Sequence, residues 1–151
     1  KGLMGDAMQA ERAVSRLYDV LVAGDFEALR QHLASLFAAI PHQWHDTHPI
    51  ARYEGYYASV FYSHLAALGL DLVPEEASHH GRLDLRLRFN DRIWLFEFKV
   101  VELAPEGAAL RQIKEKGYAD KYRAEGLPIH LIGIEFSRER RSVVGFEVES
   151  L

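Results

Sequence analysis

The chain has 151 residues, 48% of them hydrophobic and 26% charged, values typical of one folded domain with a hydrophobic core. It contains no cysteine, which excludes disulfides, thiolate metal sites and a cysteine nucleophile, and no apolar run approaches the roughly 18 residues of a membrane-spanning helix. The formal net charge of −4 excludes nucleic-acid binding through bulk positive charge, so such binding would need a local basic surface. Without cysteines or a leader-like segment, the expected compartment is a reducing cytoplasm.

The first part of the chain is predicted to be helical because apolar residues recur at three- and four-residue spacing. The predicted helices are 6–22, 26–39 and 52–68. Gly24 ends the first helix and Asp25 caps the second. Residues 40–50 form a loop bracketed by prolines, and Gly69 ends the third helix.

From residue 70 the hydrophobic period changes to that of strands. The predicted strands are 70–76, 82–89, 93–100, 128–136 and 142–151, with a crossover helix at 105–124. Pro74 places the first strand at a sheet edge or the end of a strand. This order of elements predicts an α/β domain with a mixed sheet, preceded by N-terminal helices.

The second and third strands are predicted to form a hairpin, because Asn90 and Asp91 tolerate the left-handed conformations of a two-residue turn. The register that follows from this turn pairs Phe89 with Arg92, Leu87 with Trp94, Leu85 with Phe96, Asp84 with Glu97, and Arg82 with Lys99. The first three pairs make an apolar face. The last two pairs place acids and bases on the opposite face.

Two opposed carboxylates repel each other across a sheet, and burial increases the cost of their charge. Arg82 and Lys99 could compensate Asp84 and Glu97 as a cross-strand ion network on a solvated face. A divalent cation is the other solution, since Mg²⁺ binds through one or two carboxylates together with water and phosphate. A lysine beside such a cation can hold or deprotonate a water molecule.

Asp84 followed by Glu97-x-Lys99 resembles the signature of the PD-(D/E)XK nuclease superfamily. The predicted order of elements is similar to the αβββαβ core of that family. "YEGYYASVFYSHLAALGL", "RQIKEKGYADKY" and "HLIGIEFS", with the two hairpin strands, look like the nuclease-like domain at the C-terminus of bacterial AAA-ATPase-like proteins. The resemblance divides the chain into a helical linker, 1–49, and a nuclease-like domain, 50–151, and implies an N-terminal ATPase-like domain in a longer chain.

The resemblance also implies roles for individual residues. The implied cofactor is Mg²⁺ or Mn²⁺. The sequence departs from the family pattern at one position, since the residue before Asp84 is Leu83 where the family often has proline. The implied site consists of Asp84 and Glu97 as metal ligands, the Phe98 carbonyl as a third ligand, Glu54 as an accessory acid, Lys99 as the residue that activates water, and Gln112 beside them. Glu54 could serve a second metal ion.

These residues predict metal-dependent hydrolysis of nucleic acid, with DNA favoured over RNA. Arg82, Arg86 and Arg88 on the hairpin would contact the substrate, as would basic residues of the crossover helix, unless that helix face is merely solvated. The alternative is an inactive module that binds nucleic acid or a partner and couples to the missing ATPase. A homodimer is left open.

His42, His45 and His48 recur every third residue in the proline-rich loop, a spacing that could bind a transition metal. We expect no functional metal there, since such a loop seldom holds three imidazoles in one geometry. His79 and His80 precede the acidic hairpin, where capping or solvent exposure is the expected role.

Overall fold

A mixed five-stranded sheet in the order β1-β2-β3-β4-β5 forms the centre of the computed structural model, which describes residues 3–39, 50–78 and 81–151. The strands are β1 (Asp71–Ser78), β2 (Gly81–Phe89), β3 (Arg92–Val101), β4 (Ile129–Ser137) and β5 (Ser142–Ser150). The helices are α1 (Leu3–Ala23), α2 (Phe26–Ala38), α4 (Ile50–Ala66), α5 (Ala108–Glu115) and the 3₁₀ helix η1 (Asp120–Glu125). Strands β3 and β4 are parallel, and the other neighbours are antiparallel. The fold is therefore α/β with a mixed sheet, as predicted.

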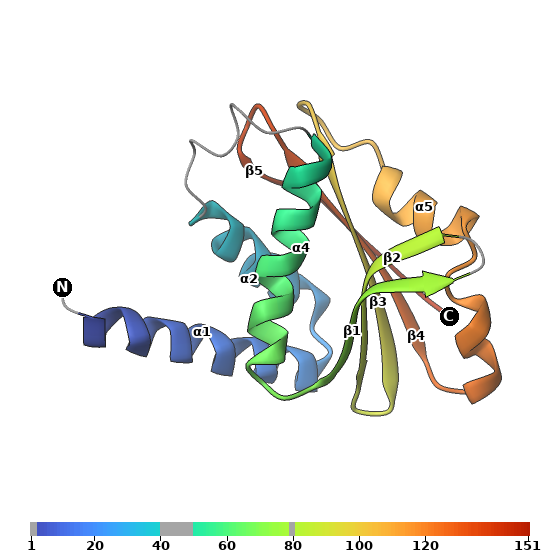
Figure 1. Ribbon diagram of the computed structural model, residues 1–151, viewed down its shortest axis with the longest axis horizontal. Coiled ribbons are helices and arrows are strands. Elements are labelled where there is room, and N and C mark those ends of the chain that lie inside the picture. The colour runs from blue at the N-terminus through green and yellow to red at the C-terminus, as the bar shows by residue number, and fades with distance from the viewer. Residues whose placement is uncertain (1–2, 40–49, 79–80) are drawn as a thin grey trace.

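Helices cover both faces of this sheet (Figure 1). Helices α2 and α4 pack on one face and α1 packs against them, while α5 packs on β3 and β4 from the other face. The predicted helices and strands before α5 are confirmed, with ends that differ by a few residues. No described helix is long and apolar enough to cross a membrane.

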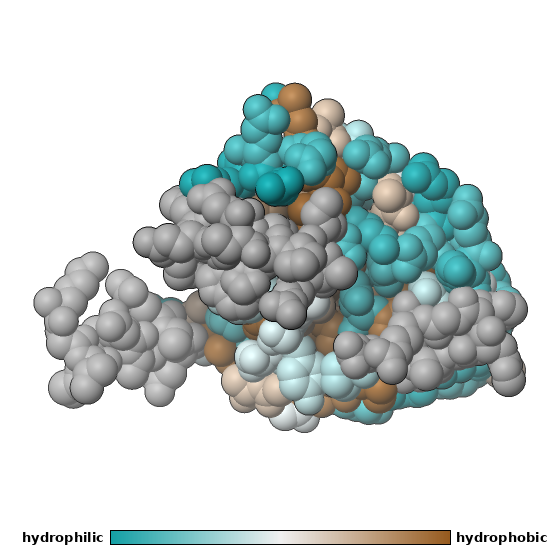
Figure 2. Space-filling model, turned by 45° about the horizontal axis from the view of Figure 1, so that its top comes forward, coloured by the Kyte–Doolittle hydropathy of each residue, from teal (hydrophilic) through white to brown (hydrophobic). Residues whose placement is uncertain are grey.

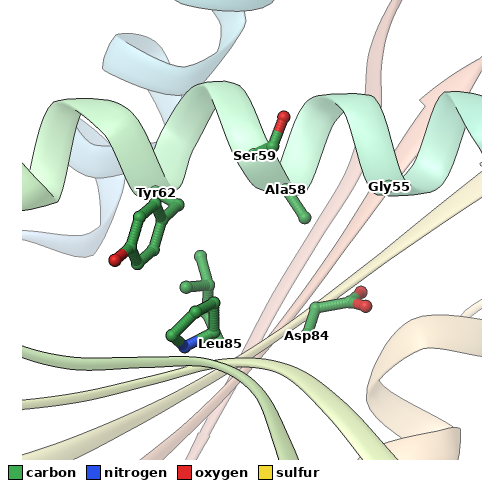
Figure 3. A pocket seen from close by; sticks show the side chains of 7 residues that line it. Gly55, Ala58, Ser59, Tyr62, Asp84 and Leu85 are labelled. Atoms are coloured by element: carbon green, nitrogen blue, oxygen red, sulfur yellow. The ribbon is translucent and has the colours of Figure 1, made fainter.

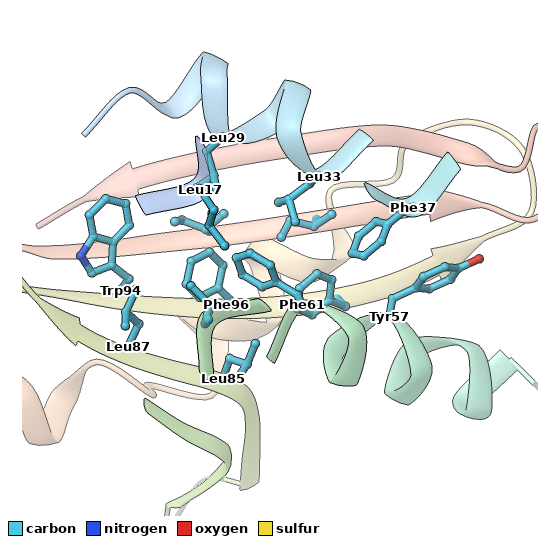
Figure 4. Packing of buried hydrophobic residues seen from close by; sticks show 14 of the residues in the cluster. Leu17, Leu29, Leu33, Phe37, Tyr57, Phe61, Leu85, Leu87, Trp94 and Phe96 are labelled. Carbon is cyan, nitrogen blue, oxygen red and sulfur yellow. The ribbon is translucent and has the colours of Figure 1, made fainter. Parts of the chain in front are cut away.

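The main core lies between the sheet and the N-terminal helices (Figure 4). Leu17 of α1 and Leu33 of α2 are fully buried, and they meet Phe61 of α4 and Phe96 of β3 in one cluster. Burying each such side chain contributes about 1.5–3 kcal/mol. Helices α1 and α2 therefore share their core with the sheet, and the domain boundary near residue 50 stays a prediction.

The predicted hairpin between β2 and β3 is confirmed in its turn and in most of its register. Asn90 and Asp91 have φ values of 56° and 57°, the left-handed pair that a tight hairpin turn requires. The ladder runs from Phe89 opposite Arg92 to Leu85 opposite Phe96 and ends there. The predicted continuation of the ladder to Lys99 is wrong, because β2 leaves β3 at Asp84.

The predicted crossover helix at 105–124 is also wrong in length, since α5 ends at Glu115 and η1 follows as a separate element. Gly117 has a φ of 64°, and its N–H donates to the carbonyl of Lys114 while the N–H of Tyr118 donates to that of Ile113. This is the Schellman arrangement that ends a helix at glycine. The break turns Tyr118 into the core beneath α5.

The five histidines discussed above, at positions 42, 45, 48, 79 and 80, lie outside the described residues.

Candidate active site

The site lies where β2 separates from β3. Leu85 and Leu87 belong to the main core, whereas Leu83 packs with the cluster beneath α5, so β2 twists strongly at Asp84. Figure 1 shows the far ends of β1 and β2 diverging from β3 on the side of α5. The second half of β3 therefore has β4 on one side and no ladder partner in β2 on the other.

Two carboxylates take the place of the missing strand. Asp84 Oδ2 accepts a hydrogen bond of 2.8 Å from the N–H of Phe98, and Glu54 Oε2 accepts one of 3.0 Å from the N–H of Val100. Both backbone N–H groups therefore have an acceptor where β2 has separated from β3. The free-energy cost of a buried donor without a hydrogen bond is avoided at these two positions.

The carbonyl of Phe98 points in the same direction as its N–H, since both groups of one residue in an extended strand face the same neighbour. That direction is toward Asp84. The oxygen predicted as a third ligand therefore faces the split beside the first acid. Its coordination of a metal stays a prediction.

Glu97 is buried and only partly satisfied. Its side chain projects from β3 on the face that carries α5, its exposed fraction is 3%, and its Oε2 accepts a hydrogen bond of 2.6 Å from Gln112 Nε2. Among the described residues, Oε1 has no hydrogen-bond partner. Burial and then the nearby charge of Asp84 raise the pKa of Glu97 from 4.5 to about 8. The charge of Lys99 lowers this pKa, but by less than burial and Asp84 raise it.

Lys99 supplies part of that positive charge. Its Nζ lies 3.8 Å from Glu97 Oε2 and 3.9 Å from Glu54 Oε1, and its side chain is about a quarter exposed. The amine is therefore shared between two acids at the upper limit of ion-pair distance while it remains reachable from solvent. The structure thus brings Asp84, Glu97, Lys99, Glu54 and Gln112 together, as the sequence predicted.

Gln112 reaches Glu97 because α5 lies very close to β4. A Cβ at Gly133 of β4 would collide with the backbone nitrogen of Leu110, so a side chain at this position would push the helix away. Tyr118 hydrogen-bonds to Gln112, and burial followed by the charge of Glu97 raises the pKa of its phenol. Tyr118 therefore belongs to the surroundings of the site. The sequence did not indicate Tyr118, because the predicted helix at 105–124 continues past Gly117.

A second buried acid, Glu135 of β4, was also missed. Its oxygens accept hydrogen bonds of 2.8, 3.0 and 2.9 Å from the N–H groups of Glu106, Gly107 and Ala108, which lead into α5. A Cβ at Gly145 would lie 2.7 Å from Glu135 Oε1, so glycine makes room for this carboxylate. Glu135 holds the start of α5. A lone acid in an otherwise apolar strand was the signal available to find it.

The donors at the split suit a hard divalent cation. Asp84 and Glu97 offer carboxylate oxygens, Glu97 Oε1 is buried without a partner among the described residues, and the Phe98 carbonyl faces the same side as Asp84. No three His, Asp or Glu side chains in the described part of the chain form a complete ligand group. The two carboxylates and the carbonyl are nevertheless the kinds of oxygen ligand that a hard divalent cation takes together with water and phosphate.

Two of the three hairpin arginines are less available than the sequence suggested. Arg86 is buried and its Nη1 lies 3.1 Å from Asp71 Oδ1, while Arg88 pairs with Asp71 and Glu125. Basic residues remain exposed around α5, where Figure 2 shows a mostly hydrophilic surface on the right of the view. Arg111 and Lys116 are examples, although Lys114 pairs with Glu149.

Comparison with known proteins agrees with this fold. Residues 52–146 match the model of the PD-(D/E)XK nuclease superfamily, and the chain belongs to that superfamily. The order α4, β1, β2, β3, α5, β4 is that of its restriction-endonuclease-like core, and its nucleases generally use divalent metals.

One curated relative comes from Azotobacter chroococcum mcd 1 and is described as an uncharacterized protein in the vnfD 5′ region. It is 64% identical over 140 residues, which cover 93% of this chain and 27% of the relative. The chain therefore spans about a quarter of that relative's length.

Proposed function

We propose that this domain is a metal-dependent nuclease that hydrolyses phosphodiester bonds, with DNA as the favoured substrate. The observation that carries the proposal is the state of Glu97: a buried carboxylate with one oxygen lacking a hydrogen-bond partner among the described residues, next to Asp84 and Lys99. A purely structural ion network would have satisfied this oxygen.

Asp84 and Glu97 would hold a Mg²⁺ or Mn²⁺ ion, together with the carbonyl of Phe98. The bound cation lowers the pKa of a water molecule and offsets negative charge on the phosphate. The hydrogen bonds from the Phe98 N–H and from Gln112 fix the two carboxylates in place before any ligand arrives.

Lys99 would orient the attacking water and add positive charge at the phosphate oxygens, where negative charge develops. Glu54 holds the amine from the other side, at 3.9 Å, and is itself anchored to Val100. Glu54 is thus placed to position Lys99, and it is also the accessory acid for a second ion.

The test is a cleavage assay with single- and double-stranded DNA and RNA, with Mg²⁺, Mn²⁺ or a chelator present. We expect cleavage that needs the metal and is lost in Glu97→Ala and Lys99→Ala. Glu139→Ala, which removes an exposed acid from the turn after β4, is the control and should cut like the parent.

Cleavage by both variants at the parental rate would contradict the proposal. Metal-independent binding without cleavage by the parent would support the alternative of an inactive binding module. Thermal melting with Mn²⁺ separates the two further, since an upward shift that disappears in Asp84→Asn shows that the acids bind metal.

We further propose that the domain works within a longer cytoplasmic protein that carries an N-terminal ATPase-like domain. The relative described above is nearly four times the length matched here, which leaves room for such a domain. Cleavage by the longer protein that depends on ATP hydrolysis would support this, and a homodimer is left open.

A further inference from the structure

A pocket lies beside the candidate metal site, between α4 and the β1–β2 hairpin (Figure 3). It encloses about 160 Å³ and is lined by Gly55, Ala58, Ser59, Tyr62, Pro74, Asp84 and Leu85. In Figure 3, Asp84 lies beneath Gly55 at one end of the pocket and the ring of Tyr62 lies at the other end. The pocket therefore extends from the proposed metal site along α4.

The described residues give no packing or conformational reason for a glycine at position 55. It lies inside α4, where glycine is less stable than alanine, and a Cβ at this position would meet nothing within 4 Å. Glycine in such a place suits the close approach of a ligand to the helix backbone. Because Gly55 stands above Asp84, that ligand would be next to the phosphate that Asp84 serves.

The chemistry of the walls indicates which part of a substrate enters. The lining residues, all within the described part of the chain, include no Lys or Arg, so the pocket suits an uncharged group. Tyr62, Pro74 and Leu85 offer a ring and apolar surfaces, on which a nucleobase can stack. From Gly55 to Tyr62 the helix rises about 10 Å, comparable to one extended nucleotide from its phosphate to the far edge of its base.

We propose that this pocket binds the sugar and base of one unpaired nucleotide next to the scissile phosphate, so that the preferred substrates are single-stranded or carry an unpaired end. A base pair would bring its second strand against α4, which forms one wall of the pocket. The inference rests on the proposed function, which places the scissile phosphate at Asp84. What it adds is the class of substrate, a nucleic acid with an unpaired nucleotide.

The experiment measures binding in Ca²⁺, which takes the same kinds of oxygen ligand, at one fixed salt concentration. The probes are a fluorescent single strand, a blunt duplex, and a duplex with an unpaired tail. Gly55→Leu fills the end near Asp84, and Tyr62→Leu removes the ring at the other end. Ser63→Leu is the matched control, an exposed position on the same helix that does not line the pocket.

We expect the parent to bind the single strand and the tailed duplex about tenfold more tightly than the blunt duplex. Gly55→Leu and Tyr62→Leu should each weaken single-strand binding by about tenfold, and Ser63→Leu should not. Gly55→Leu should melt no lower than the parent, because it replaces a helical glycine without a clash. Equal binding of all three probes, or pocket variants that bind like Ser63→Leu, would overturn the inference.

Cleavage of the same probes in Mn²⁺ separates this inference from the proposed function. If the parent cuts nothing and the pocket variants lose single-strand binding, the pocket inference is supported and the catalytic proposal is contradicted. If the parent cuts the blunt duplex best and the pocket variants cut it equally well, the pocket inference is contradicted and the catalytic proposal is supported.

Discussion

Two buried glutamates project from neighbouring strands toward the same helix, and the protein treats them in opposite ways. Glu97 and Glu135 are 3% and 2% exposed. Three backbone N–H groups donate to Glu135, whereas Glu97 accepts from Gln112 and from the backbone of Asp84, and among the described residues its Oε1 has no partner. Burial by itself therefore does not identify a functional acid. The unpartnered oxygen of Glu97 makes it the candidate for a functional acid, because missing donors leave room for a ligand.

The sharpest test replaces each acid by its neutral isostere. Glu97→Gln should lower Mn²⁺-dependent cleavage about 10³-fold, because it removes a negative ligand at the site where transition-state charge is offset. Glu135→Gln should keep most of the activity at a temperature where it stays folded. Equal losses of specific activity in two folded variants would show that the two glutamates do not differ in kind.

The raised pKa of Glu97 should also make the stability of the protein depend on pH. Glu97 has a folded-state pKa of about 8, above its ordinary 4.5, so the folded protein binds this proton more tightly than the unfolded chain does. The resulting stability is fully present below pH 4.5 and is lost as the pH rises to 8. Chemical denaturation without metal should show the parent losing about 4 kcal/mol relative to Glu97→Gln across this range.

The quantity to follow is the difference in the free energy of unfolding between the parent and Glu97→Gln at each pH. The other titrating groups contribute to both proteins, so their contributions cancel. A parallel pair of curves would contradict the raised pKa. Addition of Mn²⁺ at pH 8 should restore stability to the parent and not to Glu97→Gln, since metal binding replaces the proton.

Glu135→Gln should in turn destabilise the protein by about 2 kcal/mol, because an amide nitrogen then faces backbone donors that need an acceptor. Urea unfolding measures this directly. Glu102→Gln is the control, since it removes an exposed acid that pairs with Arg138 at the surface. A loss no larger than that of the control would show that Glu135 does not hold the start of α5.

The smallest expected effect concerns the tyrosine behind Gln112. Tyr118→Phe removes a hydrogen-bond partner of the amide that holds Glu97, so the affinity for Mn²⁺ should fall about tenfold while the rate at saturating metal changes less. Titration of cleavage with Mn²⁺ separates the two quantities. Tyr122→Phe, at a neighbouring buried phenol, should leave the affinity unchanged. An unchanged affinity in Tyr118→Phe would place this residue outside the site.

The sequence was sufficient for the hairpin turn and for the residues that lie together beside it, while their function stays a prediction. Asn90 and Asp91 identified the turn, the turn set the register, and the acid and base inside an apolar strand marked Glu97 and Lys99. Each of these inferences depends on residues close together in the chain, where local conformation decides the outcome.

Other features were within reach or depended on distant contacts. Gly117 is a local signal in the sequence that the crossover helix ends early, since glycine readily takes the left-handed conformation that ends a helix. The separation of β2 from β3 at Asp84 was not readable, because the acceptor that Val100 finds in place of β2 is Glu54, which lies 46 residues earlier on a helix. Tertiary packing of this kind overrides the simple continuation of a strand ladder.

The hydrogen bonds from Phe98 and Val100 to two acids give the site a spectroscopic label of its own. In most sheets a central strand's amide protons bond to carbonyl oxygens, but these two bond to carboxylates from β2 and α4. Their nuclear magnetic resonance shifts and solvent-exchange rates should therefore follow any displacement of Asp84 and Glu54, one amide for each acid. Occupancy of the site could thus be followed in a protein that is not turning over substrate.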